Sequence, residues 1–503
     1  MSAPPDPIAA YAAAAPDRVA IIEGDTATTY ASLNAEVNRL ANTLRSRGAQ
    51  SGERLIWCSP NAREVLVTMH ACRKLGLAAV PLSYRLTAGE LEFLIEDSQA
   101  TVVVAGPAQA AALAGVRDRL ARVRTFVDMA EWDAVLAEGS PEEPPLPDPG
   151  GLGTAMMYTS GTTGRPKGAV RSRTDRAVLA AMLGALNFGT AEGLRDPNAV
   201  EVHLTSGPLY HAGPNAFALI THLLGGTVVV LRQFDPTVWL DLVTRHHVTS
   251  TFCTPTHLKR IVSLGADVVA AADLSSMRTL IANAAPVPYA LKQDVVAKLG
   301  NGFLYEVYGS TELGIATVLG PADQLRKPGS CGRPYGGIEL KVVGADGEEV
   351  PPGEEGELFI RTALAIDGYH GDVPPLAELA DPEWKSVGDM ARIDDEGYVY
   401  ICDRKVDMVI TGGVNVYPAE VEAVLHGHPD VYDAAVIGVP DDEWGERVHA
   451  VVQPWPGQSV DVAEIETHAR ARLAGYKVPR SWEVRPELPR TESGKLVKRL
   501  LTE

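Results

Sequence analysis

The residues whose types and spacing best suit chemistry form one loop, residues 158–168, with the sequence YTSGTTGRPKG. The loop follows a strand-like apolar run, 154–158, and combines three glycines with four Ser and Thr hydroxyl groups. Glycines allow a ligand to approach the backbone closely, and successive N–H groups with neighbouring hydroxyls make a concave site for phosphate oxygens. Lys167 adds a movable positive charge. The segment therefore predicts a phosphate-binding loop.

Two common enzyme classes are disfavoured because their sequence motifs are not matched. The Walker loop places its second glycine immediately before a lysine, and counted from Gly161 that position holds Pro166. A phosphate-loop NTPase or kinase is therefore a poor match. A serine hydrolase is disfavoured too, because the chain contains no G-x-S-x-G segment.

Charge is distributed unevenly along the chain. The 45 Lys and Arg residues face 64 Asp and Glu residues, a net charge of −19 with His neutral, which argues against a nucleic-acid-binding protein. Residues 470–499 reverse this balance, with nine basic residues against three acidic ones. A basic C-terminal end on an acidic protein favours a small polyanion as the partner of that end.

The elements that must position these residues have the pattern of an α/β protein. At ~100–200 residues per domain, 503 residues suggest about three folding units. Hydrophobic residues make up 46% and charged residues 22%, an ordinary globular composition. No apolar run approaches the ~20 residues that cross a bilayer, and the N-terminus lacks the basic start of a signal peptide, so we expect a cytoplasmic protein. The five cysteines form no CxxC pair, which predicts reduced thiols.

Local patterns predict several individual elements. A helix is expected over 29–46 with Gly48 as its stop, and another over 87–97 that opens with a capping box of Thr87 and Glu90. The β-branched runs 101–105 and 227–231 are typical of buried strands. Residues 138–153 are rich in Pro, Gly and acid and predict a surface linker. Short alternating strands after residue 339 indicate a β-rich region, and the chain beyond residue 403 a compact α+β module.

The loop 158–168 resembles the phosphate-loop signature of the adenylate-forming superfamily, which includes acyl-CoA synthetases, peptide-synthetase adenylation domains and firefly luciferase. Further segments resemble the family's other signatures, in the family's order, up to Lys495. The resemblance implies a large N-terminal part, residues 1–403, made of α/β subdomains and a distorted β-barrel. It also implies a small, mobile α+β lid domain, residues 404–503.

For the nucleotide, the resemblance implies binding by the loop and by residues 283–286 (NAAP) and 306–312 (EVYGSTE). In the last segment an aromatic ring can stack on the purine, Thr311 can donate to the α-phosphate, and Glu312 can hold Mg²⁺ through hard oxygen ligands. Asp389 and Arg404 match the pair that contacts the ribose, since a carboxylate can accept from two hydroxyls at once. The complete nucleotide set is Thr159, Ser160, Gly161, Thr162, Thr163, Gly164, Lys167, Ala284, Ala285, Pro286, Glu306, Tyr308, Thr311, Glu312, Asp389 and Arg404.

For the other substrates, the resemblance implies that Tyr210, His211 and Gly309 border the carboxylic acid. Residues 411–418 resemble the loop that borders the pantetheine channel in the thioester-forming orientation, with Gly412 and Gly413 at its tip. Residues 489–495 (PRTESGK) resemble the family's C-terminal signature. Lys495 would then bridge the substrate carboxylate and the α-phosphate and reduce the repulsion between the two anions as they meet.

The sequence departs from the family pattern at three places. Residues 208–214 contain no acidic side chain to hold a substrate ammonium, which favours an acid without an α-amino group. Residues 283–284 are Asn and Ala where the family usually has two glycines. Val406 stands at the usual position of a charged hinge residue.

These expectations describe an AMP-forming acyl-CoA ligase that uses ATP, Mg²⁺ and coenzyme A, with Lys495, Glu312, Thr311 and Lys167 as its catalytic groups. The acid would attack the α-phosphate of ATP to give an acyl-adenylate and pyrophosphate, and a thiol would then displace AMP. Small and apolar residues around the expected pocket favour a fatty or other hydrophobic acid. An acyl-AMP ligase that loads a carrier protein is the alternative, and either a monomer or a homodimer is compatible with the sequence.

Overall fold

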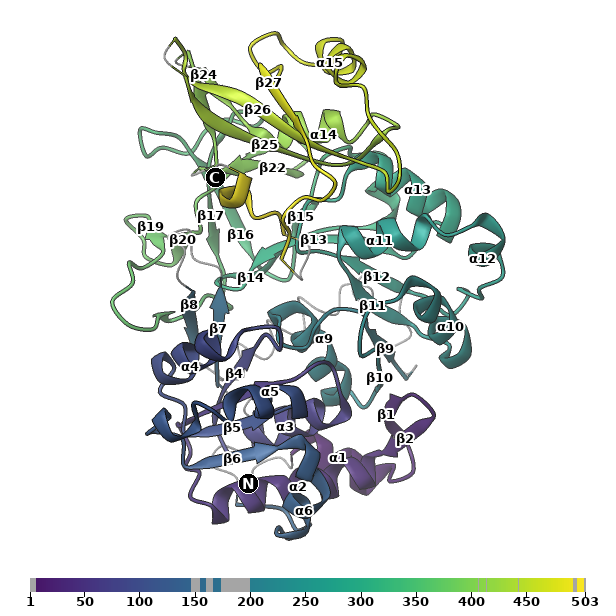
Figure 1. Cartoon of the computed structure of the whole chain (residues 1–503), viewed down its shortest axis with the longest axis vertical. Coiled ribbons are helices and arrows are strands. Elements are labelled where there is room, and N and C mark those ends of the chain that lie inside the picture. Colours follow the sequence, from purple (N-terminus) through teal and green to yellow (C-terminus); the bar gives the residue numbers. More distant parts are fainter. Residues whose placement is uncertain are drawn as a thin grey trace.

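The computed structural model describes residues 6–145, 154–159, 166–172, 200–405, 407–412, 414–441, 443–491 and 495–501. Within these ranges the strands form four sheets. Three of them, with their covering helices, make up the large N-terminal part, and the fourth belongs to a small C-terminal domain at the top of Figure 1. This confirms the α/β fold class, with a large N-terminal part and a small α+β domain.

The first sheet has seven described strands in the order β18-β8-β7-β4-β3-β5-β6. Its parallel strands are β3 (Arg54–Cys58), β4 (Ala78–Leu82), β5 (Val102–Ala105), β6 (Thr125–Asp128) and β7 (Thr154–Thr159), and its antiparallel edge is β8 (Lys167–Arg171) and β18 (Gly368–Tyr369). β7 ends and β8 begins on either side of the glycine-rich segment in the sequence, and the two strands pair with each other. The flanking helices are α1 (Pro7–Ala14), α2 (Tyr30–Ser46), α3 (Arg63–Lys74), α4 (Ala88–Asp97), α5 (Pro107–Leu113) and α6 (Trp132–Ala137).

The local signals in this part are confirmed. Thr29 caps α2 by accepting from the Ser32 N–H, and the helix stops just before Gly48, which has φ +92°. Thr87 and Glu90 form the expected capping box of α4. All five cysteines are free thiols. None of the described helices is long and apolar enough to span a membrane.

Residues 138–145, the described half of the expected surface linker, are anchored more firmly than their composition predicts. The carboxylate of Glu143 accepts from the buried Lys74 ammonium (2.7 Å) and from the side-chain amides of Asn34 and Asn38. A buried cation needs such partners because leaving it unpaired costs several kcal/mol, on the order of 3–5. The segment is therefore packed onto α2 and α3.

The second sheet has nine described strands in the order β15-β14-β13-β12-β11-β9-β10-β1-β2. They are β1 (Val19–Glu23), β2 (Thr26–Thr29), β9 (Val202–Thr205), β10 (Thr227–Val230), β11 (Ser250–Cys253), β12 (Thr279–Ala282), β13 (Leu304–Ser310), β14 (Gly314–Leu319) and β15 (Arg333–Pro334). β11, β12 and β13 run parallel, so the residues after their carboxyl ends meet at one edge of the sheet. Helices α9 (Ala212–Leu223), α10 (Pro236–His246), α11 (Pro255–Val262), α12 (Ala266–Ala270) and α13 (Tyr289–Leu299) complete this layer.

The β-rich region after residue 339 is a six-stranded antiparallel sheet among the described residues, in which β17 pairs with β16, β20 and β21. It is the region expected to form the distorted barrel. Its strands are β16 (Glu339–Val343), β17 (Gly356–Arg361), β19 (Ala377–Glu378), β20 (Trp384–Ser386), β21 (Asp389–Ile393) and β22 (Val399–Arg404).

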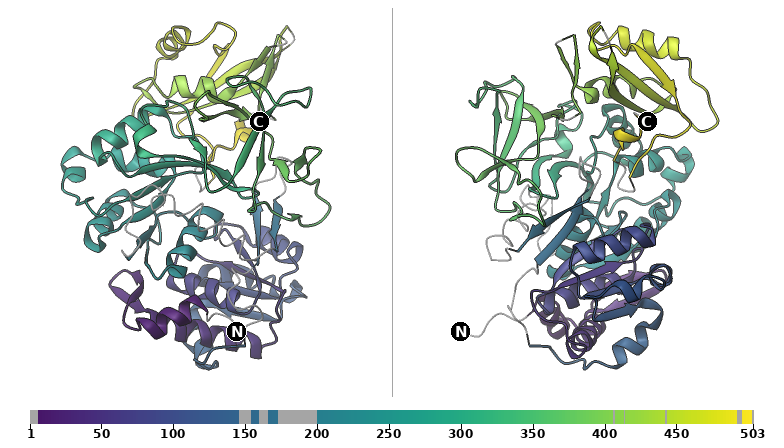
Figure 2. Two further views of the ribbon diagram at one scale, coloured as in Figure 1. Left: turned by 180° about the vertical axis from the view of Figure 1, so that it is seen from behind. Right: turned by 60° about the vertical axis from the view of Figure 1, so that its left-hand side comes forward.

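The C-terminal domain packs two helices against a sheet with the order β24-β23-β26-β25, to which β27 adds beside β26. The elements are β23 (Val409–Thr411), β24 (Val414–Val416), α14 (Pro418–Leu425), β25 (Val431–Asp441), β26 (Gly445–Pro454), α15 (Val462–Arg470) and β27 (Ser481–Val484). Its core contains Val436, Val448 and Ile465, all fully buried. The domain thus has an apolar core of its own, seated above the N-terminal part in all three views (Figures 1 and 2).

Candidate active site

A cleft of about 2990 Å³ lies between the N-terminal part and the C-terminal domain. The edge formed by the ends of β11, β12 and β13 lines one side, and β21, β22 and α14 line another. The C-terminal tail, yellow in Figure 1, descends from its domain toward β13 and enters the cleft. Residues far apart in the sequence, such as Tyr158 and Lys495, therefore share one cavity.

A tyrosine, an aspartate and an arginine form a chain of polar contacts in this cleft. The hydroxyl of Tyr308, on β13, donates to Oδ2 of Asp389 at 2.5 Å, and Oδ1 of Asp389 lies 3.5 Å from Nε of Arg404. Asp389 and Arg404 are opposite each other in the β21–β22 ladder. Burial and the neighbouring Asp389 carboxylate raise the pKa of Tyr308 well above its usual value. Tyr308 is therefore a neutral donor, and the carboxylate has one oxygen directed to Tyr308 and one to Arg404.

Glu312 lies just beyond the end of β13, close to the start of β8. Its Oε1 accepts from the hydroxyl of Tyr369 (3.1 Å), and its Oε2 has no hydrogen bond to any described residue. Lys167, the first residue of β8, holds its Nζ 5.7 Å from the centre of the Tyr369 ring. One carboxylate oxygen and one ammonium thus face the same end of the cleft, beside Thr311.

The turn after β12 is held in an unusual backbone conformation. Ala284 has φ +78°, in the left-handed region that favours glycine. Asn283 stabilises it locally, because its Nδ2 donates to the Val307 carbonyl (2.8 Å) while its Oδ1 accepts from the Ala284 N–H. Ala285 and Pro286 follow in the cleft wall. The departure from two glycines therefore keeps the turn but adds the strain of a side chain at a positive φ.

His211 and Tyr210 stand at the start of α9, where His211 is the residue that precedes the helix. Their rings lie 4.3 Å apart, and Tyr84 packs edge-on against Tyr210 at 6.1 Å. Burial and the nearby charge of Lys495 lower the pKa of His211 to about 4. Its imidazole is neutral at pH 7, and its buried Nε2 finds no partner among the described residues.

Beside His211 the cleft has an apolar wall. Phe217 of α9 and Phe252 of β11 are in contact at 6.0 Å between ring centres, and both belong to one buried cluster. A Cβ at Gly213 would come within 2.8 Å of the Phe252 ring. A Cβ at Gly309 would come within 2.1 Å of the Gly314 carbonyl, so only glycine allows β13 and β14 to approach this closely. Close packing therefore leaves no room for a side chain at either glycine.

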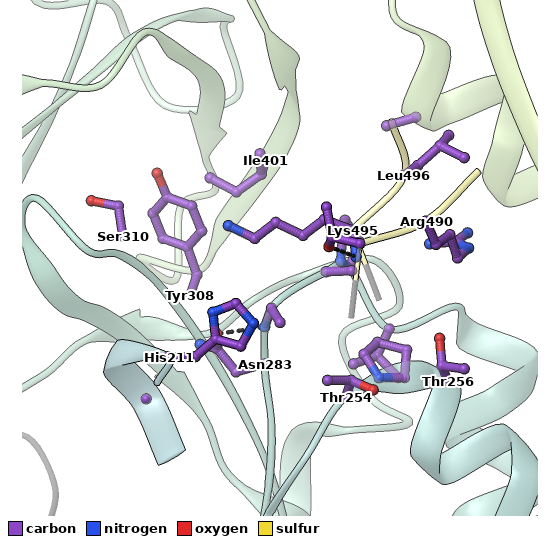
Figure 3. A pocket seen from close by; sticks show the side chains of 18 of the residues that line it. His211, Thr254, Thr256, Asn283, Tyr308, Ser310, Ile401, Arg490, Lys495 and Leu496 are labelled. Carbon is purple, nitrogen blue, oxygen red and sulfur yellow. Dashed lines mark hydrogen bonds between the residues drawn. The ribbon is translucent and has the colours of Figure 1, made fainter. Parts of the chain in front are cut away.

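Lys495 reaches the cleft from the C-terminal tail. Figure 3 shows its side chain extending between His211 and Tyr308. The Lys495 backbone is fixed by Thr491, whose N–H donates to its carbonyl (2.7 Å) and whose Oγ1 accepts from its N–H (3.1 Å). Lys495 keeps solvent-accessible surface inside the cleft, yet the surrounding protein atoms and the Arg404 charge lower the pKa of its ammonium, against the opposing effects of Glu312 and Asp389.

Two supporting residues escaped the sequence analysis. Arg171 of β8 donates to the Thr311 carbonyl (3.5 Å), and so links the glycine-rich edge to the segment after β13. Lys292 of α13 forms a buried ion pair with Oε2 of Glu306, while Oε1 accepts from the Val287 N–H (3.2 Å). Glu306 therefore stabilises the 283–287 turn through its hydrogen bond to the Val287 N–H. Single basic residues within a strand or a helix carry no sequence signal for such roles.

Some predicted site residues lie elsewhere or beyond the described part. Ser160, Gly161, Thr162, Thr163, Gly164, Gly413 and the hinge residue Val406 lie outside the described residues. Gly412 lies in the turn between β23 and β24, where its N–H donates to the Trp444 carbonyl (2.8 Å), and it does not line the cleft. Lys405, next to the expected hinge, forms an ion pair with Glu357 (2.9 Å).

As a whole, the arrangement suits a reaction between anions. One end of the cleft has the aromatic ring of Tyr308, the hydrogen-bond acceptor Asp389 and the cation Arg404. Glu312 offers a hard oxygen ligand, and Lys495 brings a positive charge to the centre. A neutral imidazole and an apolar wall adjoin that centre. These are the elements needed to hold a nucleotide, a divalent cation and an apolar acid together.

Comparison with known proteins agrees with this geometry. Residues 8–370 match the AMP-binding enzyme family and residues 420–495 match the AMP-binding enzyme C-terminal domain. Feruloyl-CoA synthase of an Amycolatopsis species is 39% identical over 490 residues, covering 96% of this chain and 95% of the relative. Indoleacetate–CoA ligase of Aromatoleum aromaticum is 34% identical over 499 residues, covering 97% and 95%.

Among solved structures, o-succinylbenzoate-CoA synthetase (MenE) from Bacillus subtilis, in complex with its acyl-adenylate intermediate, superposes with a TM-score of 0.84. It is 28% identical, and the match covers 100% of this chain and 99% of that one. The chain belongs to the AMP-binding, adenylate-forming enzyme family, as an AMP-forming acid–thiol ligase that uses ATP, Mg²⁺ and coenzyme A.

Proposed function

We propose that this ligase activates an aromatic or arylalkyl carboxylic acid, converts it to the acyl-adenylate and transfers it to coenzyme A. The observation that carries the proposal is the convergence in one cleft of Lys495, the Tyr308–Asp389 pair and an apolar wall built from two phenylalanines. Aromatic rings favour edge and offset packing against other rings, which suits a flat acid in this recess. The expectation of a fatty acid is thereby narrowed to an aromatic one, in keeping with the aromatic acids named in the two curated relatives.

The nucleotide would be held by residues from three elements. Asp389 accepts from the ribose hydroxyls, with Arg404 beside it, and the Tyr308 ring stacks on the purine. Residues 284–286 cover the other side of the base. The strained backbone at Ala284 fits a binding loop, because such strain is maintained where the surrounding structure over-determines it.

Magnesium would be held by Glu312, and the residues present fit that ion. Glu312 lines the cleft, its Oε2 has no hydrogen bond to a described residue, and carboxylate oxygens are ligands that Mg²⁺ prefers. When bound, the ion would neutralise phosphate charge and polarise the phosphoryl centre. Thr311 and Lys167 donate to the phosphate oxygens from either side, and Arg171 holds Thr311 in position.

Lys495 would bring the two anionic reactants together. Figure 3 shows its side chain between Tyr308, whose ring would stack on the purine, and His211, so the ammonium lies where the acid carboxylate would approach the α-phosphate. An ammonium at this point favours the transition state because the negative charge there becomes concentrated between two oxygens it can contact. His211, neutral at pH 7, offers a hydrogen bond to the acid without a second charge. The lid, residues 404–503, would then rotate about the hinge to admit the thiol.

A carrier protein is the second candidate acceptor. It is favoured by one specific similarity, to a fatty acid–acyl-carrier-protein ligase of Streptomyces coeruleorubidus, which is 33% identical over 494 residues. Loading of a carrier would need the same acyl-adenylate and would differ only in the thiol. The two acceptors are separated by supplying free coenzyme A or a phosphopantetheinylated carrier to the same enzyme.

The experiment is a substrate panel read by pyrophosphate release and by acyl-CoA formation. Ferulate, indoleacetate, benzoate, octanoate, palmitate, acetate and malonate are each supplied with MgATP, with and without coenzyme A. We expect the largest kcat/KM for an aromatic acid and one AMP for each acyl-CoA formed. A preference for malonate, acetate or palmitate over every aromatic acid would refute the proposed substrate class.

A further inference from the structure

A lysine of the N-terminal part contacts two adjoining aromatic rings of the C-terminal domain. Lys259, on α11, has its Nζ 4.1 Å from the ring centre of Tyr432 and 4.9 Å from that of Trp455. The same ammonium donates to the Tyr432 carbonyl. A cation over two aromatic faces is attracted by both ring quadrupoles, and most strongly when it is withdrawn from water.

The rings are held in position by their own domain. Tyr432 lies near the start of β25 and Trp455 just after β26, and the rings meet edge to face at 5.0 Å. The indole N–H of Trp455 donates to the Pro429 carbonyl at 2.9 Å. The box formed by Tyr432 and Trp455 therefore exists independently of Lys259, and the lysine is the part that belongs to the other domain.

The box is linked to the tail that carries Lys495. Asp433, next to Tyr432, receives two hydrogen bonds from Arg490, at 2.6 and 2.7 Å. Arg490 pairs with Leu496, the residue after Lys495, in an isolated antiparallel bridge, and its neighbour Thr491 is hydrogen-bonded to the Lys495 backbone. The position of Tyr432 therefore determines where Lys495 enters the cleft, because Asp433 and Arg490 connect the two.

The surroundings of Lys259 are unfavourable to a charge unless the rings are present. Burial and the nearby Arg490 charge together lower the pKa of Lys259 to about 8, against the opposing effects of Asp433 and Asp294. An ammonium that is partly stripped of water stays in place only where other groups replace that water. Rotation of the C-terminal domain would return Lys259 to solvent and break all three contacts at once.

We propose that Lys259 is a positioning residue which latches the C-terminal domain in the acyl-adenylate-forming orientation through the Tyr432–Trp455 box. The proposal rests on the two-step function proposed above. It assigns the latch to the first half-reaction only, because Lys495 must sit in the cleft for the acid to meet the α-phosphate. In the second half-reaction the domain has turned away and the latch is open.

The test compares the two half-reactions in matched lysine variants. Lys259→Met removes the charge and keeps an apolar chain against the rings, whereas Lys259→Arg keeps a cation that can stack on them. Lys298→Met is the control, because Lys298 lies on α13 and bonds within its own domain, to the Val262 carbonyl. Acyl-adenylate formation is measured as pyrophosphate release, and thioester formation from supplied acyl-adenylate and coenzyme A.

For Lys259→Met we expect kcat of acyl-adenylate formation to fall about tenfold, with thioester formation unchanged or faster. Lys259→Arg should restore most of the first rate, and Lys298→Met should match the wild type in both. An equal fall in both half-reactions would indicate a folding defect, and unchanged rates in both would mean that no latch operates. Either result overturns the proposal.

A distance measurement tests the latch without any activity. Spin labels are placed on two exposed positions, Asp267→Cys of α12 and Arg470→Cys of α15, in the presence of the native thiols, most of which are buried. The latched protein should give one main distance, and adding Lys259→Met should broaden it or add a second population. An identical distribution in both overturns the latch. A wild-type enzyme that releases no pyrophosphate with any acid overturns the proposed function instead, and leaves this measurement valid.

Discussion

Replacing Lys495 with alanine should separate the two half-reactions of this enzyme. The ammonium projects from the C-terminal tail between His211 and Tyr308, with the charges of Arg404, Glu312 and Asp389 close enough to change its pKa. An ammonium about 4 Å from an anionic oxygen, at an effective dielectric constant of about 20, contributes about 4 kcal/mol. Lys167 and Thr311 would still contact the phosphates in the variant, so we expect a loss of about 10²–10³ in the rate of acyl-adenylate formation.

The assay measures each half-reaction by itself. Pyrophosphate release from acid and MgATP reports the first, and acyl-CoA formation from chemically prepared acyl-adenylate reports the second, which should stay close to the wild-type rate. Lys341→Ala is the control, since Lys341 lies on β16 away from the cleft and pairs with Glu349 (3.8 Å). The reasoning is refuted if both half-reactions fall together, or if the first falls less than about fivefold, about 1 kcal/mol.

Four further predictions follow from the same geometry. Because the pKa of Lys495 is lowered and its protonated form is needed, kcat/KM for ATP should fall as pH rises through a value below the ordinary 10.5. Lys495→Arg should lose this fall at alkaline pH, and the same pH profile in the variant would assign the fall to another group. Asp389→Asn should raise KM for ATP about 10- to 100-fold through weaker ribose hydrogen bonds, measured by initial rates with KM for the acid unchanged; a shift in the acid KM alone would contradict this role. Gly213→Ala should push against Phe252 and lower kcat/KM for the bulkiest acids more than for benzoate; equal losses across the panel would argue against a pocket wall at this position. His222 is fully buried and its pKa is lowered to about 4, so its contribution to stability is complete above pH 6.5 and is lost as pH falls toward 4. Urea unfolding should therefore show about 3 kcal/mol less stability at pH 4 from this group. His222→Gln should reduce this pH dependence, and the same pH dependence in the variant and the wild type would disprove the assignment.

Helix starts and the membership of the candidate site were predictable because they depend on short sequence patterns. A capping box acts within one turn, so Thr87 and Glu90 gave the start of α4 correctly, and the apolar periodicity of residues 29–46 gave α2. Ordered signatures also predicted that Tyr308, Asp389 and Lys495 would share a site, and the three do line one cleft. The roles assigned to them stay predictions until the variants are measured.

Long-range partners could not be read from the sequence. Glu143 looked like part of an acidic linker, but it pairs with Lys74, a contact set by the packing of α3 rather than by any neighbour in the chain. Lys292 and Lys259 are single lysines within helices, and only the folded arrangement places them on Glu306 and on the Tyr432–Trp455 box. The sequence holds no pattern for such pairs, because they depend on how two elements meet.

The central claim is that the acid carboxylate itself attacks the α-phosphate in this cleft. Acid labelled with ¹⁸O in its carboxylate, turned over with MgATP and coenzyme A, tests this claim directly by mass spectrometry of the products. The account predicts one ¹⁸O atom in each AMP and none in pyrophosphate. Label in inorganic phosphate with release of ADP, or AMP without label, would contradict it.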